Sequence, residues 1–418
     1  MSETLPGVIG ESPQTIAFTP DFIAEPWPVY DRLRGQGPLH RIVLPSGLPA
    51  WLVLDYDLSR QVLTDSRFSK DVTARGEIIA RLGAGHVNGA SAVPSMLQLD
   101  PPDHTRLRKL VSKAFTAGAS ARMRPGIQAI ADDLVAELAD RDVVDLVEHY
   151  ALPLPLSVIS EMLGFPVEDR EQLGAWSRQL MEYFTPDRSE AVSRAATECC
   201  DYIRGLIAAK RSKPGPGDLL DELIAVSADG DRLTEDELVH TVFILMIGGH
   251  ETTVNLIATA AEMLIRNDEL RERVVGHPER TPQLIEEALR FDGPAHTATM
   301  RHTTEPVVLN GMEIGAGEFV IVGLAAASRD PAKFPDPDRF DPDRSGSAHL
   351  AFGHGIHYCV GAALARLEGD IAINTLFQRF PDMRLAPGED PPWRFSFMRG
   401  RCALPVVLHE NEIQGKRR

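Results

Sequence analysis

The sequence predicts a mainly α-helical fold with a small β region. Apolar residues recur every three or four positions through most of residues 102–289, which is the spacing that gives a helix one apolar face. Strand patterns lie elsewhere, in LPAWLVLD near residue 50 and in VVLNGMEI at 307–314. In the second pattern Asn310-Gly311 is typical of a type I′ turn, so we expect two short strands joined as a hairpin.

The longest predicted helix begins at Thr234 and continues to about Ile265. Thr234 and Glu237 match the capping-box pattern, in which each side chain accepts a hydrogen bond from the other residue's backbone N–H. In the middle of this helix, Gly248 and Gly249 each lower helix stability by about 1 kcal/mol relative to alanine. A packing or functional reason must compensate for that loss.

The composition is that of an ordinary globular protein. The chain of 418 residues is 43% hydrophobic and 25% charged, so a packed interior needs no unusual device. The turn-rich break SKPGPGD at 212–218 is too short for a domain linker, and we expect one domain over residues 1–418. The formal net charge of -17 argues against nucleic acid as the main partner, because phosphate binding needs a concentrated positive surface.

The cysteines and the N-terminal residues indicate the compartment. The cysteines follow no even-spaced disulfide framework, so we expect a reducing compartment, namely the cytoplasm. The first residues lack a basic segment followed by an apolar core, and eighteen apolar residues nowhere run together. We therefore expect neither an export signal nor a membrane anchor. The four cysteines are Cys199, Cys200, Cys359 and Cys402.

One segment, FGHGIHYCVG at 352–361, places Cys359 among glycines immediately before the amphipathic stretch AALARLEGDIAINTLFQRF. A cysteine at a helix N-terminus faces free N–H groups and the positive end of the helix dipole, which favour the thiolate and lower the thiol pKa. The glycines allow sharp turns and a close approach of the backbone to a flat cofactor. The segment therefore predicts a thiolate ligand.

Two other interpretations of Cys359 are open at this point. A lone cysteine is often a small buried apolar residue. Alternatively, His354, His357 and Cys359 could bind zinc, although one thiolate without a paired cysteine motif does not match the usual structural zinc spacings.

The segment resembles the haem-binding signature Phe-Gly-x-Gly-x-His/Arg-x-Cys-x-Gly of the cytochrome P450 family and matches every defined position. This resemblance implies the mostly α P450 fold, with haem b between the helix at 234–265 and the cysteine loop. It implies that Cys359 is the axial ligand of the iron. His357 is then expected to contact a haem propionate, and Phe352 to lie in the cofactor site.

The segment IGGHETTVN is similar to the family's Ala/Gly-Gly-x-Asp/Glu-Thr motif, in which a local opening of the helix accommodates dioxygen. The resemblance implies that Gly248 and Gly249 line this groove. It also implies that Glu251 and Thr252 deliver the protons that cleavage of the O–O bond consumes. Without the resemblance, the glycines would indicate close helix packing and Thr252 a hydrogen bond within its own turn.

The segment DPPDHTRLRKL predicts a helix start in which His104 and Arg108 share one face. They resemble the family's His-x-x-x-Arg element, which implies charge-assisted contacts to the haem propionates. Arg301 stands before the hairpin, where the family commonly places another propionate-binding arginine.

On nearly the opposite face of the same helix lie Arg106, Lys109 and Lys113. These residues form either an ordinary solvated face or the docking surface for an acidic electron donor. The resemblance implies electrons from NAD(P)H through a ferredoxin reductase and a ferredoxin, because the chain carries no flavin or iron–sulfur motif.

Glu287 and Arg290 in EEALR are three residues apart on one helical face, close enough for an ion pair. By themselves they would indicate a solvated surface contact. They resemble the family's Glu-x-x-Arg element, which an arginine of a later segment usually joins. The resemblance implies that Arg339 in PDRF is this third residue and that the triad is structural.

The resemblance implies a haem-thiolate monooxygenase of the soluble bacterial class, similar to the CYP107-type enzymes that tailor secondary metabolites in actinobacteria. Such an enzyme activates O2 to hydroxylate, epoxidise or oxidatively couple a bulky, largely apolar metabolite such as a polyketide, macrolide or terpenoid. The alternatives are a non-catalytic haem-thiolate sensor and a peroxide-using peroxygenase, and the intact Glu251–Thr252 pair argues against both.

By family analogy the substrate lies against a largely apolar set of side chains, together with parts of 75–97 and 175–190. That set is Ile244, Ile247, Gly248, Ala295, His296, Ala298 and Met398.

Overall fold

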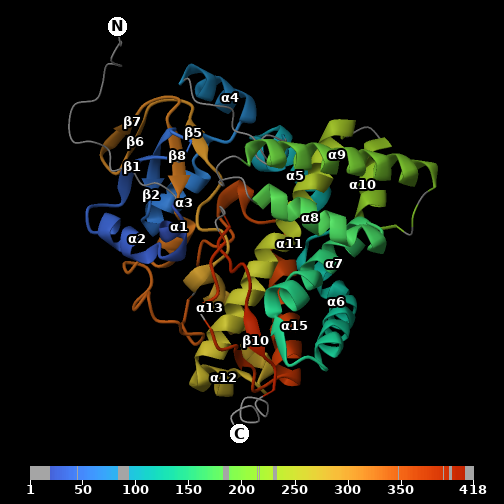
Figure 1. Cartoon of the computed structure of the whole chain (residues 1–418). Helices are drawn as coiled ribbons and strands as arrows, with labels where there is room; N and C mark the ends of the chain where they lie inside the picture. The colour runs from blue at the N-terminus through green and yellow to red at the C-terminus, as the bar shows by residue number, and fades with distance from the viewer. Residues whose placement is uncertain are drawn as a thin grey trace.

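The computed structural model describes residues 19–44, 46–82, 94–181, 188–213, 215, 217–228, 233–346, 348–388, 390–394 and 398–409. Helices form most of the molecule, and the strands β1, β2, β5 and β8 gather at one side of it (Figure 1). The predicted class, mainly α with a small β region, is therefore confirmed.

The helical part is built around α11, which runs through the middle of the molecule (Figure 1). The helices α7, α9, α13 and α15 pack against it, and α6 packs along α15. The main apolar core is formed between these helices. Their bounds are α6 Ala117–Leu138, α7 Pro153–Leu163, α8 Arg170–Met181, α9 Ser189–Ser212, α10 Leu219–Ala228, α11 Glu235–Arg266, α12 Asp268–Val274, α13 Thr281–Asp292 and α15 Ala362–Arg379.

Helix α11 agrees closely with the prediction. Thr234 is its N-cap, and both hydrogen bonds of the capping box with Glu237 are present, at 3.2 and 2.8 Å. By length and composition alone the helix could cross a membrane. However, 78% of its most apolar 18-residue window is buried inside the protein, as in the core helix of a globular fold.

The largest sheet has five strands in the order β1-β2-β8-β5-β3, in which only the β2–β8 pair is parallel. A second apolar core lies around it. The strands β4, β10 and β9 form a separate sheet. The bounds are β1 Leu39–Val43, β2 Pro49–Val53, β3 Phe68–Ser69, β4 Val143–Asp145, β5 Arg301–Thr303, β8 Phe319–Val322, β9 Arg384–Leu385 and β10 Pro405–Val407.

The predicted hairpin is present as β6 (Val307–Leu309) and β7 (Met312–Ile314). Asn310 and Gly311 both have positive φ, +49° and +76°, which is the conformation that a type I′ turn requires at its two central residues. The prediction from this dipeptide is therefore confirmed.

The smaller helices connect the sheet with the helical part. Among them, α5 carries His104 and Arg108, and α3 packs against the cysteine loop. Their bounds are α1 Pro20–Ala24, α2 Trp27–Arg34, α3 Tyr56–Thr64, α4 Val72–Arg81, α5 Asp103–Ser112 and α14 Leu324–Ser328.

Candidate functional site

The cysteine loop is a compact turn that leads directly into α15. A short 3-10 helix, Gly355–His357, precedes Cys359, and Gly361 is the N-cap of α15. The Cys359 amide donates to the Phe352 carbonyl at 2.9 Å, which closes the loop. Gly353 and Gly355 both have φ near +73°, a conformation that side chains disfavour. A Cβ on Gly355 would also lie 2.6 Å from the backbone oxygen of Leu63 on α3, so both conformation and space require glycine there.

Cys359 is free and exposed, so it is not the small buried apolar residue of the first alternative interpretation. Although solvent reaches it, the surrounding protein raises the pKa of its thiol by desolvation, more than the Gly361 amide and the Arg108 and Arg366 side chains lower it. Desolvation thus outweighs the lowering of the thiol pKa expected from the helix N-terminus, which the Gly361 amide still provides. The zinc interpretation finds no support either, because no group of three His, Cys, Asp or Glu within the described ranges is placed to hold a metal ion.

A cluster of basic side chains lies beside the cysteine loop. The rings of His104 and His357 are 4.3 Å apart, and burial lowers the pKa of both. Neither nitrogen of His104 has a hydrogen-bond partner among the described residues, and the same holds for Nε2 of His357. Arg108 reaches the same region and donates to the Tyr358 carbonyl. Arg301 is buried nearby, where desolvation lowers its pKa to about 10.

These unpartnered donors fit the carboxylates of a haem. Buried polar atoms normally have hydrogen-bond partners, and a buried cation requires an anion. A propionate carboxylate would satisfy both requirements, and Cys359 stands in the same region with its sulfur free. The residues expected to bind the cofactor, His104, Arg108, Arg301 and His357, are thus brought together at one place.

Lys70 also belongs to this cluster, although no motif in the sequence predicted its role. It is only 2% exposed and directly follows the short strand β3. Its charge acts on both His104 and His357. A single lysine in FSKDV carries no motif, and only the pairing of β3 with β5 brings it to the site.

The two glycines of α11 have different surroundings. A Cβ on Gly248 would meet no atom within 4 Å, and the residue is exposed although most of its helix is buried. A Cβ on Gly249 would lie 2.9 Å from the side chain of Ile159 on α7. Gly248 therefore faces open space, as the expected groove requires. The groove role expected for Gly249 needs correction, because this residue allows close packing of two helices.

We expect alanine at these adjacent positions to have opposite effects on stability. Gly248→Ala gains up to about 1 kcal/mol of helix propensity without a clash. Gly249→Ala crowds Ile159 and lowers the free energy of unfolding by about 1–3 kcal/mol, the usual effect of overpacking. Urea unfolding of both variants beside the wild type measures the difference. Equal effects at the two positions would contradict this distinction.

Glu251 and Thr252 are neighbours in sequence but contact different groups. The Thr252 hydroxyl donates to the Gly248 carbonyl at 3.0 Å, which is the local hydrogen bond within its own turn. The Glu251 carboxylate is buried and accepts from Ser177 of α8 at 3.1 Å and from Arg394 at 2.8 Å. Thr252 therefore lies at the open side of α11 next to Gly248, whereas Glu251 is bound by partners from two other parts of the chain.

The chain matches known proteins over most of its length. The family model described as Cytochrome P450 matches residues 157–277 and 279–414. Cytochrome P450 107B1 of Saccharopolyspora erythraea is 45% identical over 403 residues, which cover 95% of this chain and 98% of that protein. The chain belongs to the cytochrome P450 family. The resemblance inferred from the cysteine loop is confirmed.

A second relative and a solved structure are similar to this chain over nearly its whole length. Vitamin D(3) 25-hydroxylase of Pseudonocardia autotrophica is 42% identical and covers 94% of this chain and 96% of its own length. The structure of the tirandamycin C-bound P450 monooxygenase TamI superposes with a TM-score of 0.87 at 40% identity, covering 94% of this chain and 100% of that one. This P450 is therefore an oxidoreductase of the monooxygenase class, and the P450 fold with its haem cofactor follows from the family.

In this P450 the Glu287–Arg290 pair is fully buried in α13. Arg290 donates to both carboxylate oxygens of Glu287, at 2.7 and 2.8 Å, and its remaining donors reach the carbonyls of Ser328, Pro337 and Arg339. The pair therefore fastens α13 to the irregular segment at 328–344. The interpretation as a solvated surface contact is wrong, because neither side chain is exposed.

The third arginine of this group is Arg344. Its Nε lies 3.4 Å from the Glu287 carboxylate, and its side chain is nearly buried. The side chain of Arg339 is 68% exposed and its closest ion-pair partner is Asp341 at 3.7 Å. The expectation for Arg339 is therefore corrected. Residue spacing could not separate the two arginines, because the segment between them is irregular and its path decides which side chain turns inward.

Arg106 also differs from expectation. It pairs with Glu237 at the start of α11 and with Asp103 at 3.2 Å, so its charge is offset within the protein. Lys109 and Lys113 are exposed on the same side of α5. Of the three residues expected to form a docking surface, Lys109 and Lys113 are exposed, whereas Arg106 joins α5 to α11.

The expected substrate-facing residues come partly from helix α11 and partly from segments outside this helix. Ala295 and Met398 form an isolated β-bridge between two segments that are distant in sequence, and Ile244 and Ile247 lie on α11 in the turn before Gly248. Ala298 is tied to the large sheet by its amide, which donates to Val322 at 2.8 Å.

The His296 side chain contacts other residues of the protein interior. Its Nε2 lies 3.1 Å from Asp292, and its ring packs against Trp27 and Tyr30 of α2. The imidazole is thus committed to a buried cluster, which contradicts the expected substrate contact. Residues 83–93 and 182–187, which belong to the expected substrate segments, lie outside the described residues.

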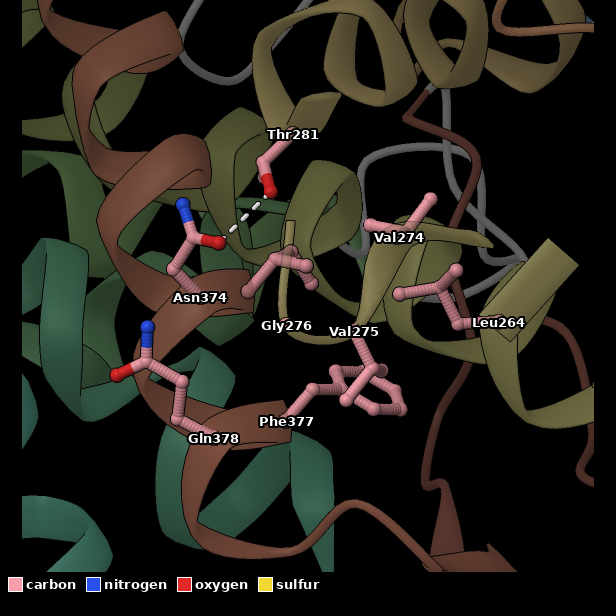
Figure 2. Close-up of a pocket in the computed structure, with 9 residues that line it drawn as sticks. Leu264, Val274, Val275, Gly276, Thr281, Asn374, Phe377 and Gln378 are labelled. Atoms are coloured by element: carbon pink, nitrogen blue, oxygen red, sulfur yellow. Dashed lines mark hydrogen bonds between the residues drawn. The ribbon is translucent and has the colours of Figure 1, made fainter. Parts of the chain in front are cut away.

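Figure 2 shows a pocket at the other end of α15 from the cysteine loop, between α15, the end of α11 and the α12–α13 connection. Its lining is mostly apolar, and the one hydrogen bond drawn there joins Thr281 and Asn374 at 2.8 Å. No cysteine and no charged side chain lines it, so the chemistry of this P450 does not take place there. The lining residues are Leu264, Val274, Val275, Gly276, Thr281, Ile373, Asn374, Phe377 and Gln378.

Proposed function

We propose that this P450 is a haem-thiolate monooxygenase that hydroxylates a bulky, largely apolar secondary metabolite of the polyketide, macrolide or terpenoid type. Epoxidation and oxidative coupling are compatible with the same residues. The observation that carries the proposal is the convergence of a free exposed Cys359 with unpartnered buried basic side chains. The names of the relatives support the substrate class, since one is a vitamin D(3) 25-hydroxylase and another was solved with tirandamycin C.

In this proposal the chain holds the haem at two places. The Cys359 sulfur would bind the iron, and the basic cluster beside it would bind the propionates. When bound, the haem supplies the activation of dioxygen, and the thiolate donates electron density that favours cleavage of the O–O bond. The protein supplies position, exclusion of water and protons. The residues proposed for the propionates are His104, Arg108, Arg301 and His357, and Phe352 lies in the same loop.

Protons are proposed to pass along α11. The Thr252 hydroxyl, held at the Gly248 carbonyl, is the donor nearest the open space beside Gly248. Glu251 is proposed to take protons from the outside and pass them to Thr252. For this transfer the carboxylate has to exchange its hydrogen bonds to Ser177 and Arg394, because both of its oxygens are engaged.

Electrons are proposed to come from NAD(P)H through a ferredoxin reductase and a ferredoxin in the cytoplasm. Lys109 on α5 and Lys113 at its C-cap are exposed cations on the side of the helix away from His104 and Arg108, and they suit an acidic partner. Ferredoxin docking would therefore weaken with rising salt concentration, since exposed charge pairs are screened.

Thr252→Ala tests the proposed proton path. A positioned proton donor contributes about 10²–10⁴-fold, so we expect product formed per NAD(P)H consumed to fall by about tenfold or more, with hydrogen peroxide released instead. Turnover is measured with NAD(P)H, reductase and ferredoxin, on a substrate found by spectral titration of a metabolite panel. Thr253→Val, at the buried neighbouring position, is the control and is expected to stay coupled.

The turnover measurements distinguish a monooxygenase from the two alternatives, a peroxygenase and a non-catalytic sensor. Equal product formation by wild type and Thr252→Ala would contradict the role of Thr252. Efficient turnover with hydrogen peroxide alone, and none with ferredoxin, would indicate a peroxygenase. Tight ligand binding without any turnover would indicate a haem-thiolate sensor.

A further inference from the structure

We propose that Lys70 and Arg301 form a two-cation clamp for one haem propionate, and that this carboxylate is the counter-ion which their buried pairing lacks. The inference rests on haem as the cofactor of the proposed function. It adds a residue that no motif assigns, and it explains why two cations face each other inside the protein.

The register of the sheet places the two residues together. In the antiparallel β3–β5 pair, Phe68 is opposite Thr303 and Ser69 is opposite His302. Continued by one position, the same register brings Lys70 beside Arg301, the first residue of β5. Arg301 is held from its other side, where it pairs with Val320 of β8. Like charges at opposite positions of two strands destabilise the pairing.

Both side chains are buried, at 2% exposed for Lys70 and 4% for Arg301. Burial and the charge of Arg301 lower the pKa of Lys70 well below its ordinary value. No carboxylate of the described residues lies within 4.0 Å of either cation, and neither side chain donates a hydrogen bond to another described residue. Two adjacent buried cations without an anion are unfavourable, because each loses hydration and gains only repulsion.

The nearest acidic group is already used for another purpose. Asp100 accepts from the Ser69 hydroxyl at 2.5 Å and from the backbone amide of Lys70 at 3.2 Å. Its carboxylate therefore holds the chain after β3 and attracts the two cations only from a distance. The position of Asp100 fixes the Lys70 backbone, which keeps the side chain at the basic cluster instead of in solvent.

The remaining neighbours show which ligand the clamp faces. The His104 and His357 rings lie 4.3 Å apart, and His357 stands two residues before Cys359. Neither ring nitrogen of His104 has a partner among the described residues, and Lys70 lies close enough for its charge to act on this imidazole. A carboxylate that meets these groups would belong to a molecule bound between the cysteine loop, α5 and the β3–β5 pair, and haem is the cofactor of the P450 family. An isolated inorganic anion would satisfy the charges without needing Cys359.

The test compares release of haem with release of its dimethyl ester, in which both carboxylates are neutral. Wild type and Lys70→Met are loaded with each cofactor, and transfer to an excess of apomyoglobin is followed by absorbance. A charge-assisted contact predicts that Lys70→Met releases haem about tenfold faster or more, whereas release of the ester changes less than about twofold. Lys70→Arg keeps the cation and is expected to retain slow release of haem. Lys213→Met, which removes an exposed lysine at the C-terminal end of α9, is the matched control.

Equal acceleration for haem and ester would show that Lys70 only supports the fold, and would overturn the clamp. Unchanged haem release would overturn it as well. If Lys70→Met does not accumulate with haem, Lys70→Gln takes its place, and slow haem release from that variant contradicts the inference. A different measurement tests the proposed function. That function is contradicted if the reduced wild type shows no thiolate-type carbon monoxide spectrum.

Discussion

Replacement of Cys359 by alanine is expected to remove the thiolate-type carbon monoxide spectrum of the reduced protein and to abolish substrate hydroxylation. The loop between the short 3-10 helix and α15 presents only this sulfur, and an alanine side chain has no atom that binds iron. Haem affinity is expected to fall but not to vanish, because the basic cluster of α5, β5 and the loop remains. Difference spectra and turnover with ferredoxin measure the two effects.

Cys402→Ala is the matched control. Cys402 is also a free, exposed cysteine, but it lies just before β10 and not in the cysteine loop. The control is expected to keep both the spectrum and the activity. Cys199 and Cys200 are buried in α9, where burial raises the pKa of Cys199 above its ordinary value and that of Cys200 to about 11, so they stay protonated thiols at neutral pH. A thiolate spectrum that persists in Cys359→Ala would contradict the assignment of the iron ligand.

Replacement of Arg290 by methionine is expected to lower the free energy of unfolding by about 3–5 kcal/mol. Breaking a buried ion pair from one side leaves the other charge uncompensated, and such changes cost about this much. In this protein Glu287 would keep only Arg344 and the Asp341 amide, while the carbonyls of Ser328 and Pro337 would lose the donor that Arg290 provides. Since whole domains are stable by about 5–15 kcal/mol, much of the haem-loaded protein should fail to accumulate.

Urea unfolding of the haem-loaded protein and the yield of folded protein measure this effect. Arg339→Ala is the control, because its side chain is exposed, and it is expected to change stability by less than about 0.5 kcal/mol. Arg344→Ala is expected to fall between the two, since this side chain adds one further contact to Glu287. A large effect of Arg339→Ala, with none of Arg344→Ala, would restore the assignment made from the sequence motif.

Local sequence patterns predicted the parts of this P450 that depend on a few neighbouring residues. The capping box at Thr234 and the Asn310-Gly311 turn could be predicted because each is stabilised by hydrogen bonds within three or four residues. The cysteine loop was recognised for a similar reason. Its glycines and Cys359 have to stand at fixed spacing, so the signature is continuous in the sequence.

Contacts between distant segments could not be predicted in the same way. Whether Gly249 lines a groove or packs on Ile159 depends on the approach of α7, which is about ninety residues away. His296 faces the aromatic rings of α2 and not the substrate, because the N-terminal helices pack against the segment that carries it. Spacing within one segment contains no information about such approaches.

The sequence by itself determined the family, the mainly helical class, the loop that carries the proposed cysteine ligand and most of the residues gathered around it, because these follow from local hydrogen bonding and from a continuous motif. The tertiary structure decided which charges lie together. It moved Arg344 to Glu287, paired Arg106 with Glu237, and brought Lys70 beside Arg301 across two short strands. The physical reason is that an ion pair or a buried cation depends on the distance between side chains in space, which the packing of helices and strands sets.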